Sequence, residues 1–272
     1  MTEPRDAQDG AKPDILTRAM RVLEALAGME QPAGLPGIAA AVGLSKVSTY
    51  RVLCALQNEG YIDHLGRQGY RIGSRSMALG SLIGPRPALL QRARPVLSKL
   101  AALAHENVTL HLRSGDHRVL VSSAAPNGPR ARGARVGERS PLTSGCSGRA
   151  ILAHLPANET AKVLAAHCRG GNRVEMESEL ATVRSDGYAM SFGENHPHLN
   201  GVGAALLDPL DKYPLGSIAV AGPDERLPES SLRRLAQSLT SECARLAPHF
   251  AAVLGPNSTI RLESLDVAGY VT

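Results

Sequence analysis

The sequence predicts an α+β protein with two domains, and three observations support this fold class. With 272 residues, the chain is longer than one ordinary domain. Helical spacing of apolar residues dominates the first part, up to about residue 75, whereas strand-like and helical segments alternate after about residue 90. Hydrophobic residues make up 43% and charged residues 20%, which is the composition of a soluble globular protein. We therefore expect a small helical domain followed by a domain in which helices pack on a curved antiparallel sheet.

Three helices are expected at the start of the first domain. Asp14 can cap a helix whose apolar residues recur about every 3.6 positions. A second, short helix is expected over 36–42, because Pro36 suits a first helical turn and Gly43 suits the left-handed residue that follows a helix. Ser45 then occupies an N-cap position and opens a third helix that runs to about residue 59.

A short β-hairpin is expected after the third helix. The segments "YIDHL" and "GYRIG" alternate in the period-two manner of strands and flank the tripeptide "GRQ". Helix, helix, tight turn, helix and hairpin is the order of a winged helix-turn-helix, whose last helix enters the major groove of DNA. Residues 14–75 are therefore predicted to form a DNA-binding domain, and residues 1–13 a disordered arm.

The third helix has two ends of different character. Thr49, Leu53 and Leu56 share one face and are predicted to pack against the other two helices. The N-terminal end is polar and basic, as a recognition helix requires, because its first residues approach bases and phosphates while the rest is scaffold. The side chains predicted to contact DNA are Lys46, Val47, Ser48, Tyr50 and Arg51.

Positive charge supports this interpretation through its distribution. The formal net charge of +5 is a mild excess, but the stretch from Arg67 to Arg94 holds six arginines and no acidic residue. Arg67 lies at the predicted hairpin tip, where it can meet a phosphate or a minor groove. Solvated surfaces also carry basic helix ends and hairpin-tip arginines, so the tight turn and the hairpin are what favour DNA binding.

A linker and a second domain follow. Residues 76–90 are predicted to form a linker helix, which "GPRP" interrupts. Strand-like segments "VTLHLRSG", "HRVLVSSA", "GVGAALLDPL" and "GSIAVAGP" then alternate with helical segments such as "SGRAILAHL". Residues 91–254 are therefore assigned to an α+β sensor domain, and residues 255–272 to a tail without an assigned role.

Several function classes lack support in the sequence. The four cysteines form no CxxC pair, which argues against a zinc ribbon and a disulfide scaffold. No apolar run approaches the ~20 residues of a membrane span, and the N-terminus lacks a signal-peptide core, so a cytoplasmic location is expected. "SGCSGRA" is not a GxSxG nucleophile elbow, and neither a dinucleotide loop nor a P-loop is present. We expect no enzyme activity and no cofactor.

Several separated motifs resemble one family. The run "LPGIAAAVGLSKVSTYRVLCALQNEGYIDHLGRQGYRIG" is similar to the DNA-binding domain of IclR-family bacterial transcriptional regulators. The runs "VGERSPLTSGCSGRAILAHLP", "VRSDGYAMSFGEN", "GVGAALLDPL" and "GSIAVAGP" resemble the effector-binding domain of that family in order and spacing. The resemblance covers about residues 14 to 250 and implies a GAF-like sensor domain.

The resemblance also implies partners. It implies a homodimer or a dimer of dimers on double-stranded DNA, at a near-palindromic promoter site, and a small-molecule effector. Base contacts in the family correspond to the side chains already named on the third helix. Val47 departs from the small hydroxyl residue that is frequent in the family, and an apolar contact with a thymine methyl can replace that hydrogen bond. "GLPG" likewise lacks the serine cap that is common before the second helix.

The family resemblance places the effector between the loop before "GRAIL", the acid after "GYA" and two strands. Three alanines on the strands replace the hydroxyl or thiol groups of carboxylate-binding relatives, which leaves the N–H groups at the start of the "GRAIL" helix as the best anion site. A larger or more apolar effector, such as a ring compound, is therefore favoured over a collapsed, empty pocket. The effector positions are Leu142, Gly145, Cys146, Glu194, Ala204, Ala219 and Ala221.

Four alternatives remain open. Cys146 could be a redox-sensitive thiol, although a buried cysteine that fills a loop is favoured. Glu194, His196 and His198 could bind a metal, although solvated loop histidines are favoured. The whole chain could be a sensor or enzyme with a vestigial helix-turn-helix, or an architectural DNA-binding protein without a ligand. Turnover of a candidate ligand would identify the former, and the absence of any metabolite-induced thermal shift the latter.

Overall fold

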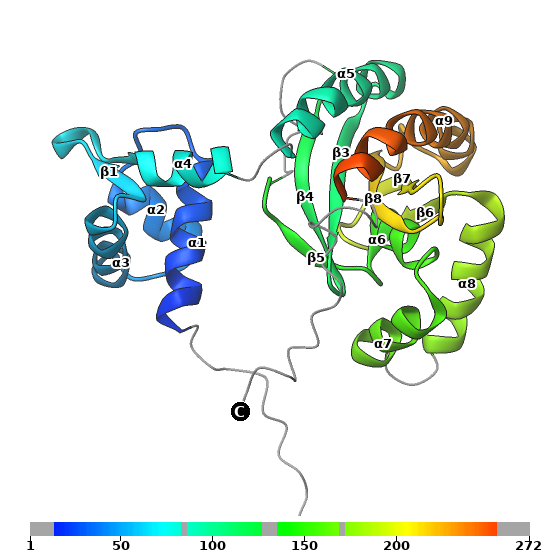
Figure 1. The fold of residues 1–272 in the computed structure, drawn as a ribbon, viewed down its shortest axis with the longest axis horizontal. Coiled ribbons are helices and arrows are strands. Elements are labelled where there is room, and N and C mark those ends of the chain that lie inside the picture. Colours follow the sequence, from blue (N-terminus) through cyan, green and yellow to red (C-terminus); the bar gives the residue numbers. More distant parts are fainter. Residues whose placement is uncertain (1–13, 83–85, 127–134, 169–171, 255–272) are drawn as a thin grey trace, which may run out of the picture. The chain divides into compact units, whose positions relative to one another are not determined.

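A computed structural model describes residues 14–82, 86–126, 135–168 and 172–254 (Figure 1). The expected arm (1–13) and tail (255–272) lie outside these residues. The chain divides into two compact units, with the division after Gly84. The predicted class, mixed helix and sheet with an N-terminal helix-turn-helix, is confirmed.

The first unit is a helix-turn-helix followed by a small hairpin. Its N-caps form as predicted: Asp14 Oδ1 accepts from the N–H of Thr17 at 2.7 Å, and Ser45 Oγ accepts from the N–H of Ser48 at 3.2 Å. Gly43 has φ 66°, in the left-handed region that favours glycine. Its elements are α1 (Ile15–Gly28), α2 (Leu35–Val42), α3 (Lys46–Asn58), β1 (Ile62–His64), η1 (Gly66–Gln68), β2 (Tyr70–Ile72) and α4 (Ser74–Leu82).

The core of the first unit holds α3 by its C-terminal half. Thr49, Leu53 and Leu56 are buried, as their spacing predicted, and Val52 is buried with them. The Thr49 hydroxyl donates to the carbonyl of Ser45 at 3.0 Å, which satisfies the one polar group on this face. The α3 helix is therefore fixed at its C-terminal half, and its start projects from the core.

The second unit is an antiparallel sheet with helices on both faces. The described strands pair in the order β5-β4-β3-β8-β7-β6. The short strands β5 and β6 were not predicted. The elements are α5 (Arg86–Ala104), β3 (Asn107–Ser114), β4 (His117–Ala124), β5 (Arg139–Pro141), α6 (Gly145–Leu152), α7 (Ala157–His167), α8 (Asn172–Asp186), β6 (Ala189–Phe192), β7 (Leu199–Leu207), β8 (Pro214–Pro223) and α9 (Glu229–Leu254).

The two faces of this sheet have separate cores. Helices α5 and α9 cover one face, where Val202, Ala204 and Ile218 pack with residues such as Phe250. Helices α6, α7 and α8 cover the other, where Ala219 packs with Cys146 and neighbouring apolar residues. We call the first of these the α9 face and the second the α6 face.

The expected linker range, 76–90, is divided in the structure. Its first part lies in α4 of the first unit, and its last part lies in α5, where Leu89 is buried in the core of the second unit. Residues 83–85, which include the first half of "GPRP", lie outside the described residues. Within the described residues, no single helix meets the length and hydropathy criteria for crossing a membrane; α2 and α3, bent by 106°, meet them only as a pair.

Candidate DNA-binding and effector sites

The start of α3 is an open helix N-terminus. Val47 is 66% exposed and Tyr50 51% exposed, and the side chains of Lys46 and Arg51 are exposed beside them. The Ser45 cap keeps this turn helical without covering it. Basic side chains and the positive end of the helix dipole therefore face solvent together, which suits a polyanion.

Two predicted contact residues also have structural partners. Ser48 is half-buried, and its hydroxyl accepts a hydrogen bond from Ser45 Oγ at 3.0 Å, so it takes part in the cap. A hydrogen bond to Cys54 raises the pKa of Tyr50, whose phenol therefore stays protonated. Lys46, Val47 and Arg51, the other members of the set, are exposed.

Arginines of the hairpin and of α4 differ in their availability. Arg71 pairs with Asp63 at 3.0 Å, and Arg75 pairs with Glu59 at 2.7 Å while lying over the ring of Tyr61. Arg67 lies exposed in the turn between β1 and β2, at the predicted hairpin tip.

The predicted effector residues do not all share one face. Gly203 pairs with Ala219 and Ala204 pairs with Ile218, and directly paired residues point to the same side of an antiparallel sheet. Ala219 belongs to the α6 face, together with Ala221, whereas Ala204 packs on the α9 face. Assigning Ala204 to the same site as Ala219 was therefore wrong.

Gly201, like Gly203, lies on the α6 face of β7, the face on which Ala204 was expected. It pairs with Ala221, and a Cβ at Gly201 would lie 3.1 Å from the sulfur of Cys146. Leu142 and Cys146 are buried against this region. Burial raises the pKa of the Cys146 thiol, which disfavours a reactive thiolate and agrees with a packing role.

A carboxylate occupies the start of α6. Glu194 accepts a hydrogen bond from the N–H of Gly145 at 3.2 Å, and both of its oxygens lie 2.5 Å from the guanidinium of Arg149. Burial raises the pKa of Glu194, but the hydrogen bonds and charge of Arg149 outweigh it and hold the net pKa below its ordinary value. The site expected to attract an anion thus already holds one.

Two polar side chains of the α6 face were missed by sequence reasoning. His111 and Arg118 are buried, and within the described residues His111 Nδ1 and Arg118 Nε have no hydrogen-bond partner. Burial, and to a lesser extent the charge of Arg118, lower the pKa of His111 to about 3, so its imidazole is neutral. Counting every second residue of "VTLHLRSG" would have placed His111 beside Thr109 on this face.

The suggested metal residues of the "GENHPH" segment do not converge. Glu194 binds Arg149, whereas His198 Nδ1 lies 3.2 Å from Asp224 with its side chain 86% exposed. Their partners come from different parts of the second unit, so the structure gives no support to this group as a metal site.

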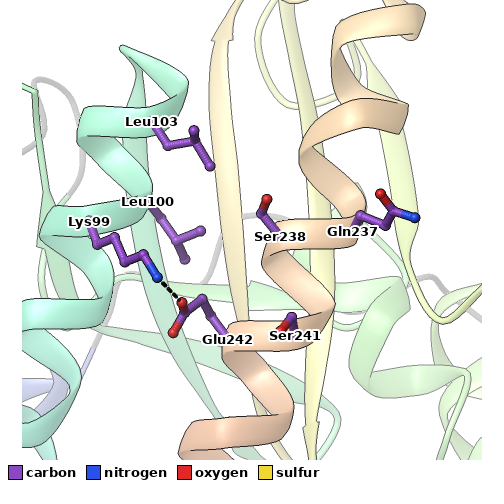
Figure 2. A pocket seen from close by; sticks show the side chains of 7 residues that line it. All are labelled: Lys99, Leu100, Leu103, Gln237, Ser238, Ser241 and Glu242. Carbon is purple, nitrogen blue, oxygen red and sulfur yellow. Dashed lines mark hydrogen bonds and ion pairs between the residues drawn. The ribbon is translucent and has the colours of Figure 1, made fainter.

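A separate pocket of about 360 Å³ lies between α5 and α9 (Figure 2). Lys99 Nζ and Glu242 Oε1 form an ion pair across it, 2.6 Å apart. Its lining contains none of the predicted effector residues, and it belongs to the α9 face.

Comparisons with known proteins agree with both units. The sequence pattern of the IclR helix-turn-helix domain matches residues 15–66, and that of the bacterial transcriptional regulator IclR C-terminal domain matches residues 86–247. The transcriptional repressor IclR of Escherichia coli strain K12 is 26% identical over 248 residues, which cover 84% of this chain and 90% of that protein.

Solved structures share the fold. The IclR protein of Thermotoga maritima has a TM-score of 0.65 at 21% identity, and the match covers 86% of this chain and 98% of that one. An IclR homologue from Microbacterium hydrocarbonoxydans, complexed with 4-hydroxybenzoate, has a TM-score of 0.63 at 18% identity. The match covers 86% of this chain and 99% of that one. With more than half of its residues matched by the C-terminal domain pattern alone, the chain belongs to the IclR family of bacterial transcriptional regulators.

Proposed function

We propose that this regulator binds a near-palindromic promoter site as a homodimer or dimer of dimers, and that a small organic effector modulates this binding. The observation that carries the proposal is the capped and open start of α3, where exposed basic side chains extend from a helix anchored by its other half. This is the geometry by which a recognition helix enters a major groove.

Each exposed residue of α3 suits a different contact. Arg51 can donate two hydrogen bonds to a guanine, and Lys46 can neutralise a phosphate or reach a base. Val47 offers a methyl surface that fits the C5-methyl group of thymine. Ser48 and Tyr50 complete the predicted set, and Arg67 in the hairpin turn is proposed to contact a phosphate or the minor groove.

The effector is proposed to bind on the α6 face, near Leu142, Gly145 and Cys146. Ala219 and Ala221 make the strand side of this region apolar, and Glu194 would repel an anion at the start of α6. The unpaired nitrogens of His111 and Arg118 favour a ligand with a polar group that satisfies them. We therefore favour a ring compound that carries one hydrogen-bond acceptor and meets Arg118 rather than the α6 N-terminus.

The mechanism is a population shift. The effector favours one spacing of the two DNA-binding domains of a dimer, and this spacing changes their fit to the two half-sites. The effector can shift the equilibrium only by its difference in affinity for the two states.

DNA binding is tested with the full chain and a labelled duplex from upstream of its own gene. Fluorescence anisotropy at ~0.15 M salt, where nonspecific charge binding is weak, should show a preference of at least about 1,000-fold over a base-shuffled duplex. Equal affinity for both duplexes, with a folded protein, would reject the proposed operator binding.

Effector binding is tested by thermal shift and calorimetry with a panel of ring compounds. 4-Hydroxybenzoate, the compound in the structural neighbour from Microbacterium, is a suitable first member because it has a ring and acceptor groups. Ala219→Val should weaken binding by obstructing the α6 face, whereas Ala204→Val adds the same group on the other face and should not. A compound that binds equally to both variants would place the effector elsewhere, and turnover of a bound compound would favour the enzyme alternative.

A further inference from the structure

A cluster of Asp116, His117 and His167 joins two distant segments of the second unit. Asp116 Oδ1 lies 2.6 Å from His117 Nδ1, and Asp116 Oδ2 lies 2.7 Å from His167 Nε2. One ligand atom from each of the three residues lies within 4.8 Å of the others. These residues belong neither to the DNA-binding set nor to the effector set.

The fold holds the three side chains in place. Asp116 lies in the tight turn between β3 and β4, after Gly115 with φ 63°, and its carbonyl accepts from the N–H of Leu142 at 3.0 Å. His117 begins β4 and pairs with Pro141 of β5. His167 is the last residue of α7. β4 and α7 therefore each bring a histidine to the one carboxylate of the β3–β4 turn.

The cluster is accessible without being freely solvated. The side chain of Asp116 is 42% exposed, that of His117 26% and that of His167 22%. An ion can enter from solvent, and the half-buried rings lose less rotamer freedom on binding than histidines on an open loop would. His198, by comparison, is 86% exposed and faces a single carboxylate.

We propose that Asp116, His117 and His167 bind a first-row transition-metal dication of the Zn²⁺ type, with one coordination position left for water or another ligand. Two imidazole nitrogens and one carboxylate oxygen form a donor set that Zn²⁺ and its neighbours prefer. Mg²⁺ and Ca²⁺ prefer oxygen ligands and are expected to bind far more weakly. Metal binding at these three residues does not depend on the proposed DNA or effector contacts.

The present contacts show how the metal would enter. One nitrogen of each imidazole lies at hydrogen-bond distance from the carboxylate, where a ring N–H can donate to it in the free protein. Metal ligands at ~2.0–2.1 Å in a tetrahedral site lie about 3.3 Å apart, so small shifts of the side chains suffice. For the metal to bind, the nitrogen that faces Asp116 must present its lone pair: in a neutral imidazole the proton moves to the other ring nitrogen through solvent, and in a protonated one it is released to solvent.

A bound metal would cross-link the end of α7 to the β3–β4 turn. The turn is hydrogen-bonded to Leu142, which precedes the start of α6. Metal binding should therefore raise the unfolding temperature of the second unit by mass action.

The test uses the full chain without a histidine tag, after removal of metal with EDTA. Isothermal calorimetry and native mass spectrometry with Zn²⁺ should give one ion per chain, and Mg²⁺ at the same concentration should give none. The Co²⁺ complex should show visible absorption bands typical of four-coordinate N/O ligation. Failure of the wild-type chain to bind a stoichiometric ion would overturn the proposal.

Three variants separate a metal site from a hydrogen-bonded brace. His167→Ala should weaken Zn²⁺ binding by more than the roughly 10–100-fold that loss of an outer-shell partner costs. Asp116→Asn, which conserves shape, should weaken it as well, and circular dichroism checks that both variants fold. His198→Ala is the matched control and should retain wild-type affinity. Unchanged affinity in either His167→Ala or Asp116→Asn would also overturn the proposal.

Discussion

Two helices of this protein, α3 and α6, each start just after a serine, and their N-termini have opposite surroundings. At α3, Ser45 caps the helix and the first turn is exposed. At α6, Ser144 gives no cap, because its hydroxyl donates to Asn195 at 2.6 Å, and the whole helix is buried. Glu194 accepts from the first N–H of α6 instead.

The difference teaches that a helix N-terminus is an anion site only if nothing in the protein fills it. The dipole and free N–H groups favour a negative charge at both helices. In α3 this charge can come from a DNA phosphate, whereas in α6 the protein supplies it through Glu194, held by Arg149. A glycine is required at position 145, because its φ is 67° and because a Cβ there would lie 2.4 Å from the amide nitrogen of Asn195, the residue after Glu194.

Removing the buried cation that holds Glu194 at the start of α6 is expected to have the largest effect on stability. The Arg149 side chain is 4% exposed and pairs with Glu194 and Glu179, so Arg149→Met leaves two carboxylates without their cation. Urea unfolding followed by circular dichroism should show a loss of about 3 kcal/mol in stability. Arg173→Met removes an exposed i,i+4 pair and should cost only about 0.5 kcal/mol or less. Similar losses in both variants would contradict a structural role for the buried pair.

Weakening the open start of α3 should affect DNA binding and leave stability unchanged. Arg51→Ala should reduce operator affinity by about 1–3 kcal/mol if the guanidinium reads a base. Anisotropy titrations with the upstream duplex measure this loss. Arg173→Ala, an equal change of charge in the second unit, is the control, and equal losses in the two variants would show that only net charge matters.

The two serines provide a smaller and more direct comparison. Ser45→Ala removes the cap of α3 and should lower the stability of the first unit by about 1 kcal/mol. Ser144→Ala removes no cap bond and should cost less. Thermal unfolding of both variants measures the two losses of stability. A larger loss in Ser144→Ala than in Ser45→Ala would contradict the assignment of the cap to Ser45.

The smallest expected effect is a pH dependence from Glu194. Its pKa is held below the ordinary 4.5, so the stability it contributes is present above about pH 4.5 and is lost as the pH falls through its lower folded value. The stability difference between the wild-type chain and Glu194→Gln should therefore shrink as the pH is lowered from about 6 to about 3.5. A difference that stays constant over this range would show that Glu194 does not titrate with a depressed pKa.

Local features were predictable from the sequence. The caps at Asp14 and Ser45, the turn at Gly43 and the packing face of α3 each depend on residues within one or two turns of each other, and all four predictions are confirmed. The contacts of the exposed residues with bases stay predictions, since they involve a partner.

Contacts between distant segments were less predictable. The pair of Arg149 and Glu194 joins residues 45 positions apart, and nothing near either residue indicates the other. Strand β5 was missed because it has three residues and ends in proline, and β6 because it has four. The error at Ala204 was avoidable: Val202, Ala204 and Leu206 alternate along β7 on the α9 face, which leaves Gly201 for the α6 face.

The contrast between the two helix starts is tested most directly by hydrogen exchange of the full chain, free and bound to DNA. The peptide spanning residues 43–51 should gain protection with the upstream duplex and not with a shuffled one. The peptide spanning 142–149 should be protected already in the free chain, because α6 is buried and Glu194 accepts from Gly145. Equal protection of residues 43–51 by both duplexes, or rapid exchange of residues 142–149 in the free chain, would contradict this account.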